Sequence, residues 1–180
     1  MLTAAENIGG LPEDALIRLA AFIASSEPAG PQRVQSALAR RLDALKLPKA
    51  ARLHAVRLAE GLYEGYRLSD GPSVRRWAAL LGRESAHEGL ALRSWYDSIF
   101  RPGSDWMAER ARVEAVLAAK PPLALEELKI RGSDVVSLLN GEKGPKVKAV
   151  MNRIYLDVLD SPELNDRQKL LMLAWMYIKA

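Results

Sequence analysis

The hydrophobic positions of this chain recur at helical spacing over most of its length. Apolar residues follow one another at intervals of four, three, four and four along one predicted face: Ala51, Ala55, Leu58, Leu62 and Tyr66. Such spacing places side chains on a single side of a helix. No useful length of chain alternates apolar and polar residues as a half-buried strand does. The pattern therefore predicts an all-α fold.

Proline and glycine divide this helical pattern into segments, because proline favours the first turn of a helix and glycine favours turns. The predicted helices of the first two thirds of the chain cover residues 12–23, 31–45, 48–66, 73–85, 87–100 and 105–120. Pro121-Pro122 interrupts the pattern after the last of them. We therefore predict two domains, a helical body at 1–122 and a small helical tail at 123–180.

The predicted tail opens with helix, tight loop and helix. Ser133 is placed to cap a short helix with its hydroxyl, and Asn140-Gly141 is placed to end it. Gly144 stands at the next N-cap and Pro145 at the first helical position, where the missing N–H of proline costs nothing. This Gly-Pro loop is helix-hairpin-helix-like.

The start of the second tail helix is a predicted anion site. Its first amides have no partners within the helix, and the positive end of the helix dipole lies there. Lys143, Lys146 and Lys148 surround it. Helical spacing places Lys146 and Arg153 on one outer flank and Lys148 on the other. Phosphate is the expected anion.

The last helix differs from the others in its composition. Asn165 and Gln168 predict a capping-box-like start. From Leu170 to Ile178 the helix is apolar almost all round, so it is expected to be buried or to cover a partner.

Charge and composition narrow the function classes. The 180-residue chain contains no cysteine, which excludes a disulfide framework and thiolate metal ligation. It shows no signal-peptide pattern and no long apolar run, so we expect no membrane association and a cytoplasmic location. Its net charge is +4, and from Lys129 onward nine basic and six acidic residues give +3. This permits nucleic-acid binding without requiring it.

Three short motifs stand in order along the last third of the chain. They are Leu128-Lys-Ile-Arg-Gly-Ser-Asp134, Lys143-Gly-Pro-Lys-Val-Lys148 and Val158-Leu-Asp-Ser-Pro-Glu-Leu-Asn165. Together they resemble the tail domain of bacterial CCA-adding tRNA nucleotidyltransferases. That tail typically shows a Gly-x-Asp-Leu turn, a Gly-Pro helix start and an acidic Gly-x-Leu-x-Asn bend. Here Ser161 to Asn165 occupies the bend without its usual glycine, and the preceding helical segment resembles the family's body domain more loosely.

The resemblance implies a function for the chain. The tail of this family grips the tRNA elbow, so tRNA is the expected partner and phosphate contacts set the distance to the 3′ end. The expected RNA-binding residues are Arg131, Lys143, Gly144, Pro145, Lys146, Lys148 and Arg153. A catalytic head, in the same or another chain, is the second expected partner.

The chemistry of nucleotide transfer is not encoded in these residues. The catalytic head of this family holds magnesium with an Asp-x-Asp pair, and no Asp-x-Asp occurs in the 180 residues. We therefore expect no catalytic residue, no metal site and no cofactor here, with magnesium, CTP and ATP needed only by the head. Glu13-Asp14 and Arg18 approximate the family's nucleotide-reading motif, but the arginine comes one residue late and is rotated by about 100° around a helix.

The sequence predicts structural roles for the histidines and the tryptophans. His54 and His87 lack the spacing of a metal site. The four tryptophans are interleaved with arginines: Trp77, Trp95, Trp106 and Trp175. Proteins that bind unpaired bases stack them on such aromatic side chains. The helical spacing of these tryptophans favours a place in the core instead.

Two alternatives from other classes remain open. One is a stand-alone helix-hairpin-helix-like module that binds DNA through the Gly144 loop. The other is a helical interaction protein whose apolar final helix docks a partner. Measuring the affinities for tRNA and for duplex DNA at one salt concentration separates the first alternative from tRNA binding. The absence of salt-dependent RNA binding favours the second alternative.

Overall fold

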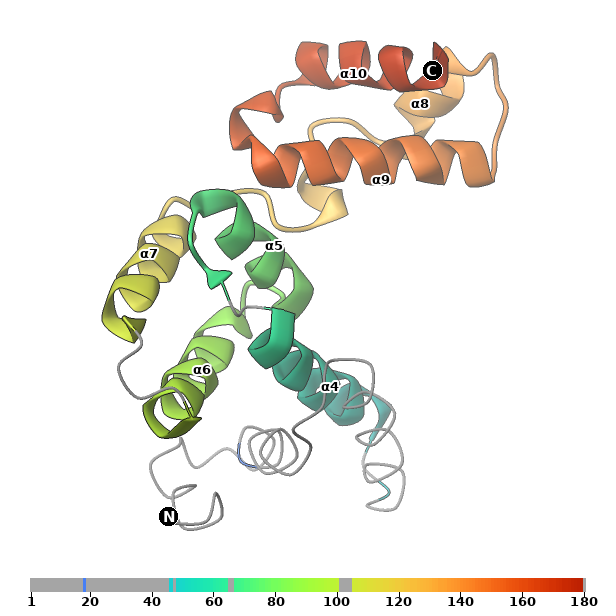
Figure 1. The fold of residues 1–180 in the computed structure, drawn as a ribbon. Helices are drawn as coiled ribbons and strands as arrows, with labels where there is room; N and C mark the ends of the chain where they lie inside the picture. The colour runs from blue at the N-terminus through green and yellow to red at the C-terminus, as the bar shows by residue number, and fades with distance from the viewer. Residues whose placement is uncertain (1–17, 19–45, 47, 65–66, 101–104, 180) are drawn as a thin grey trace. The chain divides into compact units, whose positions relative to one another are not determined.

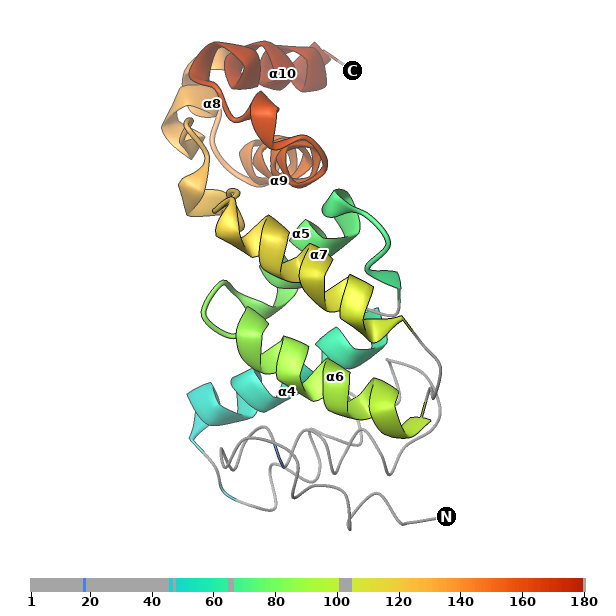
Figure 2. The ribbon, with the colours of Figure 1, turned by 90° about the vertical axis from the view of Figure 1, so that its left-hand side faces the viewer.

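The structure, a computed structural model, describes residues 18, 46, 48–64, 67–100 and 105–179 (Figures 1 and 2). Every regular element in these ranges is helical, which confirms the predicted all-α fold. The α-helices are α4 (Lys49–Glu64), α5 (Gly71–Leu81), α6 (Ala86–Phe100), α7 (Trp106–Ala118), α8 (Gly132–Leu138), α9 (Pro145–Asp160) and α10 (Arg167–Lys179). Two short 3₁₀ helices accompany them, η3 (Leu125–Glu127) and η4 (Pro162–Leu164).

Some of the predicted features lie outside the described residues. They are the helices expected to start at Pro12 and Pro31, and the Glu13-Asp14 pair. None of the described helices is long and apolar enough to cross a membrane.

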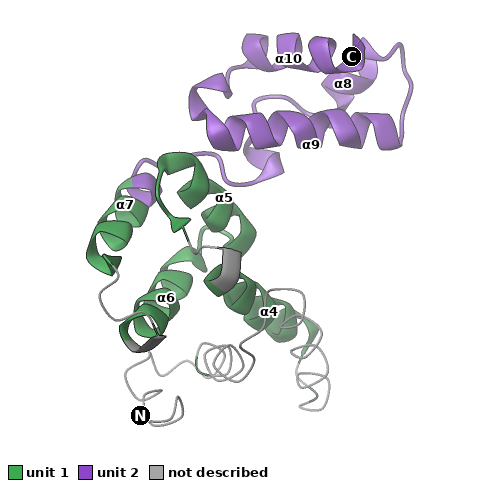
Figure 3. Ribbon diagram, viewed as in Figure 1, with its two compact units in different colours: residues 1–115 green, residues 116–180 purple. Residues whose placement is uncertain are grey.

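The chain divides into two compact units, residues 1–115 and 116–180 (Figure 3). The division falls within α7, upstream of the domain boundary predicted at Pro121-Pro122. Leu123 belongs to the second unit, since its carbonyl accepts a hydrogen bond from the Tyr155 hydroxyl at 2.7 Å.

Helices α4, α5 and α6 pack against one another in the first unit. Three residues of the predicted stripe lie in their core, where Ala55, Leu58 and Leu62 are at most 2% exposed. Ala51 is partly buried, and Tyr66 lies outside the described residues. Two glycines allow the close approach of α5. A Cβ atom at Gly61 would lie 2.8 Å from Leu81 Cδ2, and one at Gly89 would lie 2.3 Å from Leu81 Cδ1.

The ends of α5 differ from the prediction of a helix over 73–85. Asp70 accepts a hydrogen bond from the Ser73 amide at 2.8 Å, so the helix begins earlier. Gly82 has a φ of +88°, in the region that side chains disfavour, so the helix ends earlier as well. Local capping chemistry, rather than apolar periodicity, sets these limits.

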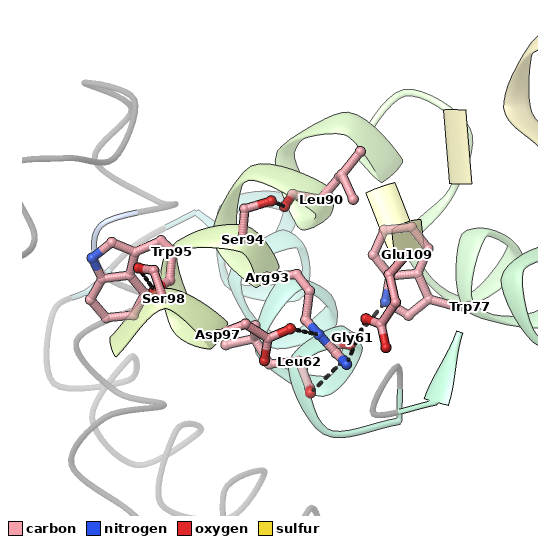
Figure 4. Close-up of polar contacts among 10 residues, drawn as sticks. All are labelled: Gly61, Leu62, Trp77, Leu90, Arg93, Ser94, Trp95, Asp97, Ser98 and Glu109. Carbon is pink, nitrogen blue, oxygen red and sulfur yellow. Dashed lines mark hydrogen bonds and ion pairs between the residues drawn. The ribbon is translucent and has the colours of Figure 1, made fainter. Parts of the chain in front are cut away.

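A buried arginine connects three parts of the first unit (Figure 4). Arg93 on α6 is 3% exposed, and its Nε donates to Asp97 Oδ2 at 2.9 Å. Its other nitrogens donate to Glu109 Oε2 on α7 at 3.2 Å and to the Leu62 carbonyl on α4 at 3.5 Å. Because a buried charge is costly without partners, this set of contacts fixes how the three helices meet.

The second unit has its own core, formed where α8 packs against both α9 and α10 (Figures 1 and 2). Val135 on α8, Ile154 and Val158 on α9, and Leu170 on α10 are fully buried in it. Val150, Met151, Ile154 and Val158 of α9 are buried in this core, so they form the inner face of the helix.

Two ion pairs of the first unit allow a matched test of burial. Arg93–Asp97 and Arg110–Glu114 share i,i+4 spacing and a 2.9 Å separation, but only the first is buried. Asp97→Ala should cost about 3–5 kcal/mol because it leaves a buried guanidinium without its main partner. Glu114→Ala should cost about 0.5 kcal/mol or less. Urea unfolding followed by far-UV circular dichroism measures both, and equal losses would contradict this view of Arg93.

Candidate nucleic-acid interface

The loop between α8 and α9 is built from backbone in unusual conformations. Asn140 has a φ of +53° and Gly141 a φ of +92°. The Asn140 amide donates to the Ser137 carbonyl at 3.3 Å, and the Gly141 amide donates to the Val136 carbonyl at 2.9 Å. This pair of bonds is a Schellman motif, which satisfies the last carbonyls of α8. The predicted stop at Asn140-Gly141 is confirmed.

Gly144 and Pro145 begin α9 as predicted. Gly144 is the N-cap with φ +116° and ψ −149°, a region almost restricted to glycine, and Pro145 follows it in the first turn. The cap makes no side-chain hydrogen bond with the start of the helix. The first-turn amides of Lys146 and Val147 therefore face outward with no acceptor supplied by the cap, at the positive end of the dipole.

Three lysines surround this helix start, and all of them are exposed: Lys143, Lys146 and Lys148. Lys146 forms a loose pair with Glu142, with Nζ and Oε2 4.0 Å apart and both side chains more than half exposed. A pair of this kind contributes little, so it does not hold Lys146 away from a ligand.

Arg153 lies two turns further along α9, on the flank of Lys146. The two side chains line one hollow of about 370 Å³, together with Ala149, Val150 and Tyr177 of α10. The Arg153 guanidinium carbon is 4.9 Å from the centre of the Tyr177 ring. The flank predicted for these two basic residues is thus formed, and Tyr177 joins it from a distant part of the sequence.

Tyr177 is oriented by a second contact. Its hydroxyl donates a hydrogen bond to Asp157 Oδ2 on α9. That bond, with a further contribution from burial, raises the pKa of Tyr177 above its usual value. The phenol therefore stays neutral at physiological pH and donates to one oxygen of the Asp157 side chain.

Arg131 lies apart from this hollow. It is exposed and lines a second hollow of about 370 Å³ with Leu125, Glu126, Ile130, Gly132 and Met151. The structure therefore brings Lys146 and Arg153 together but gives Arg131 separate surroundings.

Ser133 does not cap α8, contrary to the prediction. The helix begins at Gly132, and Ser133 lies inside its first turn. Asp134 performs the capping function from within the helix, since its Oδ2 accepts from the Arg131 amide at 2.7 Å. Its Oδ1 also pairs with Arg167 at 2.7 Å. These contacts lower the pKa of Asp134, the Arg131 bond contributing most, so its stabilising charge is lost only as the pH falls through that lowered value.

Asn165 also has a different role from the one predicted. Its side chain accepts from the Lys129 amide at 2.9 Å and donates to the Glu127 carbonyl at 3.1 Å. Asp166 instead caps α10, accepting from the Gln168 amide at 3.0 Å. The asparagine of the third motif therefore joins the α9–α10 bend to the segment before α8, and it stabilises the unit.

His54 and two of the tryptophans have structural roles. His54 contacts Glu88 at 2.8 Å and Ser85 at 3.4 Å, which joins α4 to the start of α6. Trp77 and Trp95 are buried as predicted, whereas Trp175 is 51% exposed. Within the described ranges, no three His, Cys, Asp or Glu side chains are grouped so that they could hold a metal ion.

Comparison with known protein families, with characterised proteins and with solved structures finds no match to this chain.

The backbone at Gly144 generates the first test of the interface. Gly144→Ala should destabilise the second unit by about 1–3 kcal/mol, because a side chain disfavours this conformation. Beyond the two neighbouring residues, no atom lies within 4 Å of the added Cβ, so the effect is conformational and not a clash.

Gly132→Ala is the matched control. Its φ lies outside the positive region, it is helical, and its Cβ would make an ordinary 3.7 Å contact with Val147 Cγ1. It should be neutral or stabilise by roughly 0.5–1 kcal/mol. Thermal unfolding of both variants measures the difference, and equal stability of Gly144→Ala and wild type would contradict the strained start of α9.

Proposed function

We propose that this chain binds tRNA through the phosphates that meet the start of α9. The observation that carries the proposal is a helix start at Gly144 that leaves the first-turn amides of Lys146 and Val147 without a side-chain cap, with three exposed lysines around it. Backbone N–H groups, a positive dipole end and lysine side chains are the usual components of a phosphate site.

The contacts available at this helix start favour recognition of shape over sequence. Amides and lysines contact phosphate oxygens, which are the same for every base. Duplex RNA presents its phosphates and 2′-hydroxyls across a shallow minor groove, and proteins read it mainly by shape. Such a grip suits a protein that must hold many different tRNAs in one position.

The resemblance to the CCA-adding enzymes supports a more specific role. In this proposal the chain supplies the body and tail, and the tail holds the tRNA elbow while a catalytic head adds the 3′ end. The head, with its magnesium, CTP and ATP, is supplied in the same or another chain. The motif residues Asp134 and Asn165 stabilise the unit that carries the grip.

The exposed side of α10 supports a second candidate function. Met172, Trp175 and Met176 follow one another at helical spacing and are 62%, 51% and 52% exposed. Exposed apolar stripes of this kind mark protein interaction surfaces. A helical interaction protein with no RNA role would retain this surface and would show no salt-dependent binding to tRNA.

The lysines of α9 provide the test. Lys146→Ala with Lys148→Ala should weaken tRNA binding and flatten its dependence on salt, by about 0.9 in the log–log slope for each lost duplex phosphate contact. The free energy of unfolding should change by no more than about 0.5 kcal/mol, since both side chains are exposed. Filter binding at several salt concentrations gives affinity and slope together.

A control with the same change in net charge is available elsewhere. Lys49 at the start of α4 and Lys169 on α10 are also exposed. The double variant Lys49→Ala with Lys169→Ala should leave the slope close to wild type. If both double variants lose affinity equally, binding follows net charge and the α9 site is excluded.

Catalysis gives an independent prediction. With no Asp-x-Asp in its sequence, the purified chain should not extend tRNA that lacks its 3′ end, even with CTP, ATP and magnesium. Gel analysis of labelled tRNA measures extension. Incorporation that survives purification to constant specific activity would contradict the assignment of chemistry to a separate head.

A further inference from the structure

The hollow between α9 and α10 has three kinds of surface within one small volume. Lys146 and Arg153 supply two positive charges, Tyr177 supplies an aromatic ring, and Ala149 and Val150 supply aliphatic surface. At about 370 Å³ the hollow falls within the size range of small-molecule sites, which begins at roughly 300 Å³. None of these features alone identifies a ligand, but together they restrict the class of ligand that the hollow can bind.

The charges of the hollow favour an anion. Two carboxylates contact the side chains that line the hollow. Asp157 accepts a hydrogen bond from the Tyr177 hydroxyl, and Glu142 lies 4.0 Å from Lys146, with both side chains of that pair exposed. The hydrogen bond from the neutral phenol leaves the charge of Asp157 in place, so this carboxylate offsets part of the positive charge, and Glu142 is a weak surface partner of Lys146. A phosphate that reaches this flank of α9 therefore meets two cations without displacing a strong ion pair.

The planar groups of the hollow favour a flat ring as the ligand. The guanidinium of Arg153 lies over the Tyr177 ring, and arginine planes and aromatic rings are the two surfaces on which proteins stack unpaired bases. The hydrogen bond to Asp157 holds the tyrosine in place, so its ring does not have to be ordered when a ligand arrives. Val150, which is 5% exposed, forms an apolar wall of the hollow.

We propose that this hollow binds one unpaired nucleotide of an RNA, with the base against Arg153, Tyr177 and Val150 and the phosphate between Lys146 and Arg153. The inference rests on the RNA-binding function proposed above and adds to it a preference for RNA that exposes a base. A continuous duplex cannot satisfy the site, because its bases are stacked and paired. The phosphates gripped at the start of α9 and the base in the hollow then belong to the same bound strand.

The test compares two RNAs of equal length, one fully paired and one with a single unpaired nucleotide in a bulge. The full chain should bind the bulged RNA more tightly. Tyr177→Leu should reduce that preference by roughly 5- to 150-fold, the value of one stacked base. Arg153→Met should reduce it as well, and this exposed position does not contribute to the core. The Arg153 variant therefore keeps the test valid if Tyr177→Leu does not fold.

Trp175→Leu is the matched control, since it removes an exposed aromatic side chain from the same helix but outside the hollow. It should keep the preference for the bulged RNA. Loss of preference in this variant, with retention in Tyr177→Leu and Arg153→Met, would overturn the assignment. The affinity for free adenosine monophosphate is measured as well. If it equals the affinity for the bulged RNA, the hollow is a site for a free nucleotide and not for a nucleotide of an RNA.

The two proposals fail in different ways. Equal binding of paired and bulged RNA by wild type, with a normal dependence on Lys146 and Lys148, would exclude the nucleotide site and leave the phosphate grip intact. Absence of binding to either RNA and to tRNA would exclude both.

Discussion

The interface of this protein depends on backbone that only a few residues can adopt. Three positive φ values occur between α8 and α9, at Asn140, Gly141 and Gly144. The first two close α8, and the third starts α9 without a side-chain cap. If Gly144 were an ordinary serine or aspartate cap, its side chain would occupy the amides that a phosphate needs. The loop therefore gives up the stabilisation of a capped helix, and the amides remain available to a ligand.

The second unit supports this loop by polar contacts made far from it. Asn165 and Asp134 join the segment before α8 to the regions around α10. Together with the buried core of Val135, Ile154 and Leu170, these contacts hold α8 and α9 in a single arrangement. A site made of backbone amides requires such rigidity, because a loosely held helix start would lose the gain from preorganised donors.

Features that depend on neighbouring residues could be predicted from the sequence, and those that depend on distant ones could not. Gly144-Pro145 and Asn140-Gly141 act through local backbone preferences, so their roles are readable directly. The capping roles predicted for Ser133 and Asn165 are wrong, because several side chains compete to cap a helix and the choice depends on where its first turn begins. Asn165 finds partners 36 and 38 residues away, which local spacing does not reveal.

The same distinction applies to the candidate site. Lys146 and Arg153 are seven positions apart on one helix, so helical geometry alone places them on one flank. Tyr177 comes from α10, and only the packing of α10 on α9 brings it to that flank. Arg93 shows the same limit in the first unit, since no pattern distinguishes a buried arginine from a surface one until Asp97, Glu109 and the Leu62 carbonyl are placed around it.

Amide NMR of the labelled full chain during titration with tRNA tests the central claim most directly. The account predicts that the largest shifts occur at Gly144, Lys146, Val147 and Lys148, with smaller ones along the flank at Arg153, and that added salt reverses them. Residues of α4 to α6 should change little. Shifts confined to those helices, or no shifts at a tRNA concentration that saturates filter binding, would contradict the phosphate grip at the start of α9.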